Sequence, residues 1–194
     1  MIVATNNKNK IKQLKNLAGD IKLYTLKESN IEIDIEEDGK TFEENAIKKA
    51  LAIYNLTKKS VVGDDSGLCI DYFDGWPGVY THRFLPGSTD EQRNDVIIER
   101  LVNVDEELRT AKITCVLALC DKNGTIHTFK GEVPCKITHK QRGSNLFGFD
   151  PIVELECGKT LAELSDDEKV KVNARSMAFK KMIKAIKEQN IQID

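Results

Sequence analysis

The sequence lacks any long apolar run, and what it has little of excludes several classes of protein. No stretch approaches the roughly 20 apolar residues that a membrane-spanning helix needs, so we expect no membrane partner. Lysine plus arginine (29) nearly balances aspartate plus glutamate (31), and the net charge is -2. This charge argues against binding a nucleic-acid polymer, although a local basic pocket stays open.

The five cysteines are scattered, odd in number, and form no Cys-x-x-Cys pair. This pattern indicates neither a disulfide framework nor a zinc site, so we expect a reducing, cytoplasmic location. The N-terminal apolar stretch ends at Ala4, which is too short for a signal peptide. No repeat or linker interrupts residues 1–194, so we expect a single domain. A chain of this length is long enough for that domain to have two lobes.

The periodicity of apolar residues predicts an α/β fold with a mixed sheet. Strands are predicted over residues 1–4, 21–26, 31–35, 60–62, 113–120, 125–129 and 133–140. Helices are predicted over 11–18 and after the caps Thr41, Thr89 and Ser165, the last of them continuing to Ile186. The turn Asp121-Lys122-Asn123-Gly124 between two apolar runs predicts a hairpin, so part of the sheet is antiparallel.

The most informative segment is Val61-Val62-Gly63-Asp64-Asp65-Ser66-Gly67. A buried strand is predicted to end at Gly63, followed by a loop that carries two adjacent carboxylates. Carboxylates at that place are costly unless a cation or hydrogen-bond donors meet them. Ligands of α/β sheets usually bind at strand ends, so a functional site is indicated. The alternative is an ordinary turn, since Asp, Ser and Gly are turn residues.

The loop Thr5-Asn6-Asn7-Lys8-Asn9-Lys10 leads from the first strand into a helix. Backbone N–H groups at a helix start, with Thr and Asn side chains and the charge of Lys10, are suited to an anion. The glycine-rich Gly-Lys-Ser/Thr pattern of a P-loop is absent. The alternative is a solvated, lysine-rich helix start.

A second acidic group, Glu36-Glu37-Asp38, follows the alternating segment 31–35. Oxygen ligands from two strand ends, Glu36 and Asp65, would suit a magnesium ion that bridges a phosphate substrate. The alternative for Glu36 is a solvated turn.

Segment 142–151 places Phe147 and Phe149 on either side of Gly148 and beside Asp150. An aromatic face can stack a base, and a carboxylate can accept from ring N–H groups, although core packing is the commoner role of phenylalanine. In the C-terminal helix, Lys169 and Arg175 are candidates for phosphate or base contacts, or idle surface charges.

Six motifs in a fixed order carry a resemblance to one family. They are Thr5-Asn6-Asn7-Lys8-Asn9-Lys10, Gly39-Lys40-Thr41-Phe42-Glu43-Glu44-Asn45-Ala46, Gly63-Asp64-Asp65-Ser66-Gly67, Pro77-Gly78-Val79-Tyr80, Phe147-Gly148-Phe149-Asp150-Pro151 and Lys159-Thr160-Leu161-Ala162-Glu163-Leu164. With these motifs the chain resembles the inosine/xanthosine triphosphate pyrophosphatase family, over almost its whole length.

The resemblance implies a homodimeric enzyme with an elongated mixed sheet flanked by helices and a cleft between two lobes. It implies hydrolysis of non-canonical purine nucleoside triphosphates (ITP, dITP, XTP) to monophosphate and pyrophosphate with magnesium, a house-cleaning role in the nucleotide pool.

The resemblance also assigns roles to individual positions. Asp65 matches the proton acceptor and, with Glu36, a metal ligand. The substrate-binding positions are Thr5, Asn6, Asn7, Lys8, Asn9, Lys10, Ser66, Phe147, Gly148, Phe149, Asp150, Lys169, Ala174 and Arg175. These roles agree with the chemistry. Attack of water on a phosphoryl group depends on neutralising the phosphate charge and aligning the water, more than on a covalent intermediate with the protein.

One position departs from the family pattern. The chain has Asn173-Ala174-Arg175 where the family favours Ser-His-Arg, so Ala174 removes a ring donor and acceptor from the expected base site. Losing such a partner weakens discrimination between keto purines and adenine. Two alternatives therefore stay open: the same chemistry on another modified purine or a pyrimidine triphosphate, and nucleotide binding without turnover.

Overall fold

The computed structural model describes residues 1–81, 83–144 and 147–194. The strands are β1 (Ile2–Ala4), β2 (Tyr24–Thr25), β3 (Val61–Ile70), β4 (Thr110–Cys120), β5 (Ile126–Ile137) and β6 (Val153–Glu154). The α-helices are α1 (Lys8–Leu17), α2 (Phe42–Thr57), α3 (Asp90–Arg100), α4 (Asp166–Val172) and α5 (Ala174–Glu188). Asn145 and Leu146, which belong to the predicted base-binding segment 142–151, lie outside the described residues.

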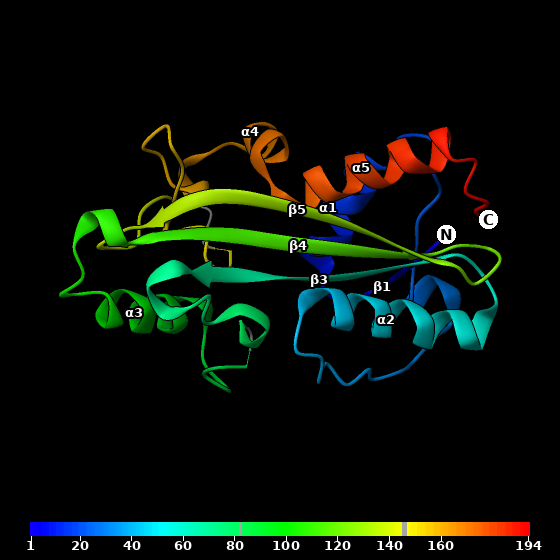
Figure 1. The fold of residues 1–194 in the computed structure, drawn as a ribbon, viewed down its shortest axis with the longest axis horizontal. Helices are drawn as coiled ribbons and strands as arrows, with labels where there is room; N and C mark the ends of the chain where they lie inside the picture. Colours follow the sequence, from blue (N-terminus) through cyan, green and yellow to red (C-terminus); the bar gives the residue numbers. More distant parts are fainter. Residues whose placement is uncertain (82, 145–146) are drawn as a thin grey trace. The chain divides into compact units, whose positions relative to one another are not determined.

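Within the described residues the strands form a six-stranded sheet in the order β2-β1-β3-β4-β5-β6 (Figure 1). β1 pairs in parallel with both β2 and β3, whereas β5 and β6 are antiparallel. β4 and β5 are neighbours joined by the tight turn after Cys120, where the Gly124 N–H donates to the Asp121 carbonyl at 3.1 Å. The predicted α/β class, the mixed sheet and this hairpin are confirmed.

The chain divides into two compact units, each made of several segments. The first contains Met1–Ser66, Cys115–Gly131 and Ala174–Asp194. The second contains Gly67–Thr114 and Glu132–Asn173. Strands β3, β4 and β5 contribute residues to both units.

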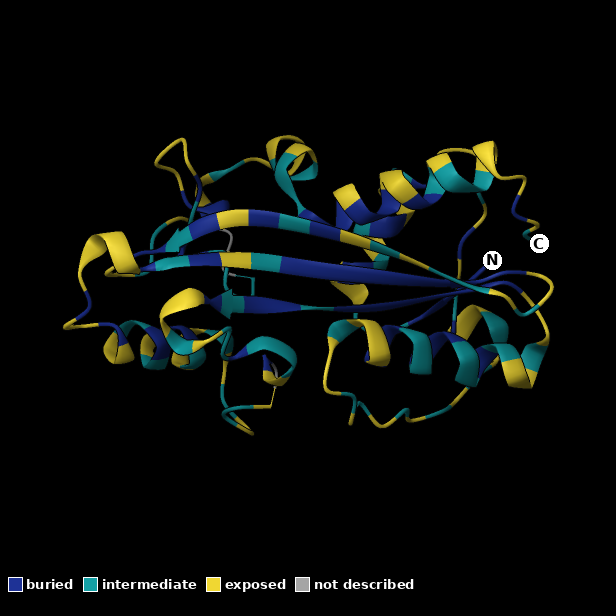
Figure 2. Cartoon of the chain, viewed as in Figure 1, coloured by how far each residue is buried: buried dark blue, intermediate teal, exposed yellow. Residues whose placement is uncertain are grey.

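In the first unit, α2 packs on the strands through its small and branched residues. Ala46, Ala50 and Ile53 are fully buried against a cluster that includes Val61 and Ala118. Gly63 allows this close packing, because a Cβ atom there would lie 2.0 Å from the Ala46 carbonyl oxygen. The buried strand residues run as dark blue bands in Figure 2. As a result, the buried face of α2 lies directly against the part of β3 that precedes Asp64.

The other helices of the first unit, α1 and α5, pack against each other. In Figure 1, α5 lies on the opposite side of the strands from α2. Leu14 of α1 is fully buried, and Ala178, Phe179 and Met182 of α5 are each at most 1% exposed. This packing places the start of α1 and the start of α5 near one another, which matters for the site described below.

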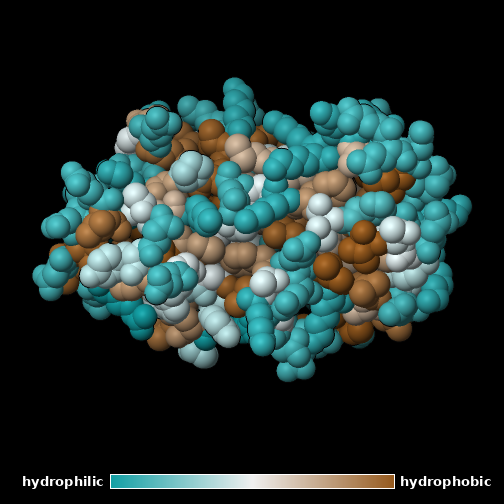
Figure 3. All heavy atoms as spheres, viewed as in Figure 1, coloured by the Kyte–Doolittle hydropathy of each residue, from teal (hydrophilic) through white to brown (hydrophobic). Residues whose placement is uncertain are grey.

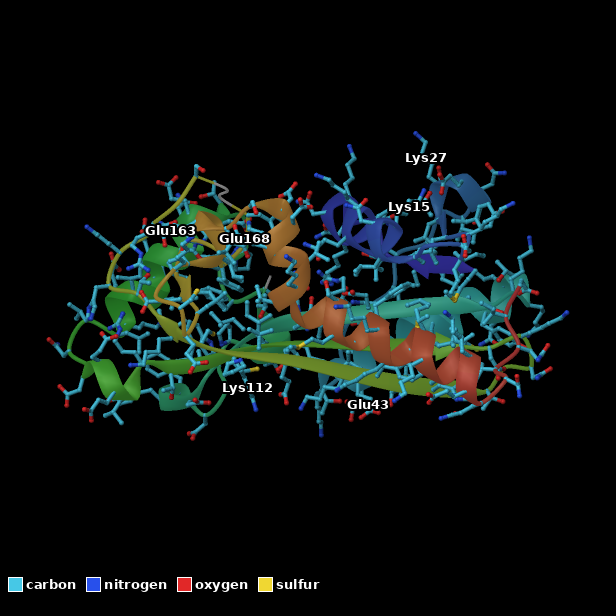
Figure 4. The ribbon with its side chains drawn as sticks, turned by 90° about the horizontal axis from the view of Figure 1, so that it is seen from above. Lys15, Lys27, Glu43, Lys112, Glu163 and Glu168 are labelled. Atoms are coloured by element: carbon cyan, nitrogen blue, oxygen red, sulfur yellow. The ribbon has the colours of Figure 1, made fainter. Side chains whose placement is uncertain are left out.

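The second unit is organised by capped helices and one buried arginine. Arg109 is fully buried and donates to the carbonyl oxygens of Leu101 (2.5 Å), Ile137 (2.8 Å) and Thr138 (2.8 Å). These bonds tie the residues after α3 to the end of β5. Capping boxes start α3 at Thr89, a short 3-10 helix at Thr160 and α4 at Ser165; the acids of the last two are Glu163 and Glu168, labelled in Figure 4.

Several predicted elements were wrong in extent. Residues 31–35 form no strand, although Ile31, Ile33 and Ile35 pack on the core while the residues between them are exposed. The alternation therefore reports an extended segment with one buried face rather than sheet pairing. Likewise, the strand predicted over 21–26 is reduced to the two residues of β2.

Two predicted boundaries were also wrong. The strands predicted at 125–129 and 133–140 are one strand, β5, because the backbone continues extended through Gly131. The long helix predicted from Ser165 is two helices, since Asn173 has extended dihedral angles (φ -96°, ψ 132°) that interrupt it.

Candidate active site

Asp64 and Asp65 lie inside β3 and not in a loop after it. The prediction of an acidic loop was wrong because buried cations and amides satisfy both carboxylates within the strand. Successive side chains of a strand point to opposite faces, so each carboxylate has its own partners. Asp64 is 0% and Asp65 5% exposed. We call the two groups of partners the Asp64 cluster and the Asp65 cluster.

The Asp64 cluster consists of Asp64, Lys10, Arg175, Ser66 and Gln13. Lys10 Nζ lies 2.5 Å from Asp64 Oδ1, and Arg175 Nε lies 2.5 Å from Oδ2. Arg175 also donates to Ser66 Oγ at 2.9 Å and to Gln13 Oε1 at 2.5 Å. Burial alone would raise the pKa of Asp64, but the charges of Arg175 and Lys10 hold it well below its ordinary value. Asp64 is therefore a permanent anion between two cations.

The predicted phosphate loop supplies Lys10 through the cap of α1. Asn7 Oδ1 accepts from the backbone N–H groups of Asn9 (3.0 Å) and Lys10 (3.2 Å), and Thr5 Oγ1 accepts from the Asn7 N–H (3.2 Å). Asn7 thus caps α1, and the first turn of that helix carries Lys10, whose ammonium contacts Asp64. Asn6, Lys8 and Asn9 of the same loop are exposed.

The Asp65 cluster consists of Asp65, Asn45, Lys49 and Glu37. Asn45 Nδ2 donates to Asp65 Oδ2 at 3.0 Å, and Lys49 Nζ lies 3.1 Å from Oδ1. Lys49 also pairs with Glu37 Oε1 at 2.9 Å. Burial raises the pKa of Asp65 above its ordinary value, and the charge of Glu37 adds to this, although Lys49 and Lys10 act against it. Asp65 is therefore closer than Asp64 to the range in which a carboxylate takes up a proton.

Glu36 and Glu37 occupy different environments. Glu36 is exposed and, within the described part of the chain, makes no hydrogen bond or ion pair. Glu37 is half-buried and shares Lys49 with Asp65. The assignment of Glu36 to a metal stays a prediction, and its neighbour is the carboxylate that the structure places in the Asp65 cluster.

Ala174 and Arg175 begin α5, and both are buried. Ala174 is 2% exposed, and its carbonyl oxygen lies against Gly131 of β5. Arg175 reaches the Asp64 cluster, so the prediction that it is an idle surface charge is excluded.

In the second unit, the structure brings together two other predicted site residues. Lys169 Nζ of α4 lies 2.7 Å from Asp150 Oδ2. Phe147 and Phe149 are half-buried, and the Asp150 N–H donates to the Phe147 carbonyl at 3.1 Å, which closes a turn around Gly148. The segment therefore carries aromatic rings and a paired carboxylate on one short turn.

The residues that sequence reasoning missed are Gln13, Glu37, Asn45 and Lys49. A signal for two of them exists in α2, where Asn45 and Lys49 are four residues apart, as Ala46 and Ala50 are, and are buried like them. Polar residues at core positions of an amphipathic helix indicate partners in the interior. The pairings of Gln13 and Glu37 depend on the tertiary fold and leave no such pattern.

Asp65 and Glu37 supply oxygen donors of the kind that hold a divalent cation, whose shell water and phosphate would complete. Asp65 and Glu37 both touch Lys49 Nζ, so their carboxylates are neighbours. Over residues 1–81, 83–144 and 147–194 no group of three or more His, Cys, Asp or Glu side chains is placed to hold a metal. In the same residues no helix combines the length and apolar character needed to cross a bilayer.

Two adjacent carboxylates, Asp64 and Asp65, are buried in one strand of a mixed α/β sheet, and their pKa values are shifted in opposite directions. Buried charges arranged in this way are typical of an enzyme active site. Residues 1–185 match the model of the Ham1 family, and the chain belongs to that family. The predicted family is thereby confirmed.

Curated relatives match along nearly their whole length. The chain is 40% identical over 191 residues to a dITP/XTP pyrophosphatase of Bacillus subtilis, covering 95% of this chain and 96% of the relative. It is 39% identical over 183 residues to a dITP/XTP pyrophosphatase of Geobacter sulfurreducens, covering 92% of each. Among solved structures, a HAM1 protein from Coxiella burnetii is similar with a TM-score of 0.88 and 33% identity, covering 96% of this chain and 98% of that one.

Proposed function

We propose that this protein hydrolyses non-canonical purine nucleoside triphosphates, dITP and XTP among them, to the monophosphate and pyrophosphate. The names of its relatives support this reaction, as does membership of the Ham1 family. The observation that carries the proposal is the pair of buried carboxylates at consecutive positions of β3. Asp64 is held by two cations and Asp65 by Asn45 and Lys49, and their pKa values are shifted in opposite directions. Carboxylates whose environments push their pKa values apart take different roles in acid–base chemistry.

Asp65 is the proposed proton acceptor. It takes a proton from the water that attacks the triphosphate, and its burial in β3 beside Asn45 and Lys49 holds the carboxylate in place for that role. Asn45 holds one of its oxygens through a 3.0 Å hydrogen bond. Lys49 holds the other and neutralises part of the charge, so the geometry of the base is fixed before substrate binds.

The Asp64 cluster is the proposed phosphate site. Two cations, Lys10 and Arg175, surround one carboxylate, so the cluster retains a positive charge for an anionic ligand. Ser66 lies in the same cluster through Arg175. We assign the remaining phosphate contacts to the loop that begins at Thr5 and contains Asn6, Asn7, Lys8 and Asn9.

The Asp65 cluster is the proposed magnesium site, since the two negative charges of Asp65 and Glu37 outnumber the one positive charge of Lys49. Magnesium would supply neutralisation of phosphate charge there. Glu36, proposed from the sequence as the partner of Asp65, and the adjacent Glu37 are alternatives for the second ligand.

Base recognition is assigned to Phe147, Gly148, Phe149 and Asp150, with Lys169 holding Asp150. The absence of the family's histidine at Ala174 leaves the preference among bases to be measured. Hydrolysis of another modified purine or of a pyrimidine triphosphate, and binding without turnover, are outcomes of the same measurement.

We further propose that the protein is a cytoplasmic homodimer that forms one bilobed domain per chain. The five cysteines, all of which lie in the described residues, form no disulfide, which is compatible with a reducing compartment. Apolar side chains reach the surface over α2 in Figure 3, and Leu56 of that helix is 63% exposed. In the second unit, Tyr72 is 52% and Tyr80 is 57% exposed. Single exposed apolar side chains are also common on monomers, so the homodimer is proposed on the family resemblance.

The test is product analysis over a panel of dITP, XTP, dGTP, dATP and dUTP, by ³¹P NMR, with magnesium and with excess EDTA. We expect pyrophosphate and monophosphate from dITP and XTP when magnesium is present, and no turnover with EDTA. Release of inorganic phosphate and a diphosphate would contradict the proposed bond cleavage. Binding of dITP without any product would support the non-hydrolytic alternative, and preference for dUTP would support a different substrate.

A further inference from the structure

Two side chains of α3 hold the backbone of Gly148 at both of its polar groups. The Gly148 N–H donates to Asp90 Oδ2 at 2.9 Å, and Asn94 Nδ2 donates to the Gly148 carbonyl at 3.0 Å. Asp90 and Asn94 are four residues apart and therefore share one face of the helix. All three residues belong to the second unit. We call this arrangement the Gly148 clamp.

The conformation of Gly148 explains why a clamp is needed. Its φ is +57°, in the left-handed region, and a Cβ there would meet nothing within 4 Å. Glycine is thus required for backbone conformation and not for space. Because glycine reaches many other conformations equally well, the residue alone does not hold the turn from Phe147 to Asp150 in one shape. Bonds to both the N–H and the carbonyl select a single shape.

The clamp is itself firmly supported. Thr89 caps α3 with a complete capping box, and Arg93 pairs with Asp90 and donates to the Ser88 carbonyl at 2.8 Å. Asn94 Nδ2 also donates to Gln141 Oε1 at 3.2 Å. These contacts fix the side chains of α3 before any ligand is present.

Asn94 has a feature that packing alone does not explain. It is 1% exposed, and its Oδ1 has no hydrogen-bond partner among the described residues. A buried acceptor without a partner costs free energy, and an apolar side chain of similar size would avoid that cost. The Nδ2 donor explains why an amide stands at this position, because it donates to the Gly148 carbonyl.

We propose that Asp90 and Asn94 are positioning residues that set base recognition by holding Phe147–Asp150 in its binding conformation. This rests on the proposed function, in which that segment contacts the base. The two residues act through Gly148 and do not touch the reacting atoms. Their loss raises KM and weakens discrimination between bases, while kcat stays near its wild-type value because the proton acceptor Asp65 is untouched.

The test compares two variants of Asp90 that both lose its charge. Asp90→Asn keeps an oxygen that accepts from the Gly148 N–H, whereas Asp90→Ala keeps none. We expect Asp90→Ala to raise KM for dITP by about 3- to 10-fold, the factor that one lost hydrogen bond supplies, and to lower the ratio of kcat/KM for dITP over dATP. Asp90→Asn should recover most of both quantities.

Asn94→Asp provides a second, nearly isosteric test, since it replaces the donor with an oxygen that faces the Gly148 carbonyl. It should change KM and the dITP/dATP ratio in the same direction as Asp90→Ala. Glu91→Ala, an exposed acid in the same first turn of α3, is the matched control and should leave both quantities unchanged. Melting temperatures identify any variant that fails to fold; if Asn94→Asp does, the Asp90 pair carries the test.

The outcomes separate the two proposals. If the wild-type protein hydrolyses dITP but Asp90→Ala keeps its KM and base ratio, the clamp has no positioning role and the inference is overturned. If the wild type binds dITP without hydrolysis, the proposed function fails, and the same comparison is made on Kd values from calorimetry. If it neither binds nor hydrolyses any triphosphate, both proposals are overturned.

Discussion

Asp64 and Asp65 are consecutive residues of β3, yet their environments shift their pKa values in opposite directions. The difference arises from the partners on each face of the strand. Asp64 has two cations within 2.5 Å, Lys10 and Arg175, whereas Asp65 shares a single ammonium with Glu37. One sheet position thus supplies both a permanent charge and a carboxylate suited to proton transfer.

The first prediction concerns these two titrations. In ¹³C-carboxyl NMR of the metal-free protein, we expect Asp65 to titrate above the ordinary aspartate pKa of 3.8 and Asp64 well below it. The physical reason is burial for Asp65 and the charges of Arg175 and Lys10 for Asp64. Titration of both carboxyls near 3.8, or in the reverse order, would refute the assignment of their roles.

The second prediction concerns stability. Asp64→Asn leaves Lys10 and Arg175 buried without their counter-charge, which should lower the free energy of unfolding by about 3–5 kcal/mol near neutral pH. A carboxyl with a lowered folded-state pKa stabilises above its unfolded pKa and loses that contribution as the pH falls toward the folded value. The difference between wild type and Asp64→Asn in urea denaturation should therefore shrink below about pH 4.

A double-mutant cycle checks this interpretation. Arg175→Gln alone should also destabilise, and the double variant should cost less than the sum of the two single changes, because the remaining charge is no longer unpaired. Strict additivity would mean that the ion pair is not the source of the effect.

The third prediction separates the two neighbouring glutamates. Glu37→Gln should raise the magnesium concentration needed for half-maximal activity, since Glu37 lies beside Lys49 in the Asp65 cluster. Glu36→Gln is the matched control in position and chemistry, and its exposed side chain should give a smaller increase. The reverse order would return the second metal ligand to Glu36, as the sequence suggested.

Much of the fold was predictable because local signals agreed with the tertiary structure. The caps at Thr41, Thr89 and Ser165 and the turn at Asp121–Gly124 appear where their side chains predict them. Errors arose where one pattern is compatible with two structures. The alternation at 31–35 needs only an extended chain on a core, and sheet pairing also requires a partner strand that no local pattern specifies.

The site was predictable in its parts but not in its pairings. Turn propensity at Asp64-Asp65 pointed to a loop, and the buried cations that keep these residues in β3 come from Lys10 and Arg175, at opposite ends of the sequence. Such long-range pairs carry no spacing signal. Asn45 and Lys49, at core positions of α2, are the members that burial reasoning could have found.

The most direct measurement is the turnover of dITP by Asp65→Asn. We expect kcat to fall by about 100- to 10,000-fold, the contribution of a general base, with the circular-dichroism spectrum of the wild type retained. Asp38→Asn, which alters an exposed acid that pairs with Lys48 outside the Asp65 cluster, should keep kcat within about twofold of wild type, because exposed ion pairs contribute little. A folded Asp65→Asn protein that releases pyrophosphate at the wild-type rate would contradict the account.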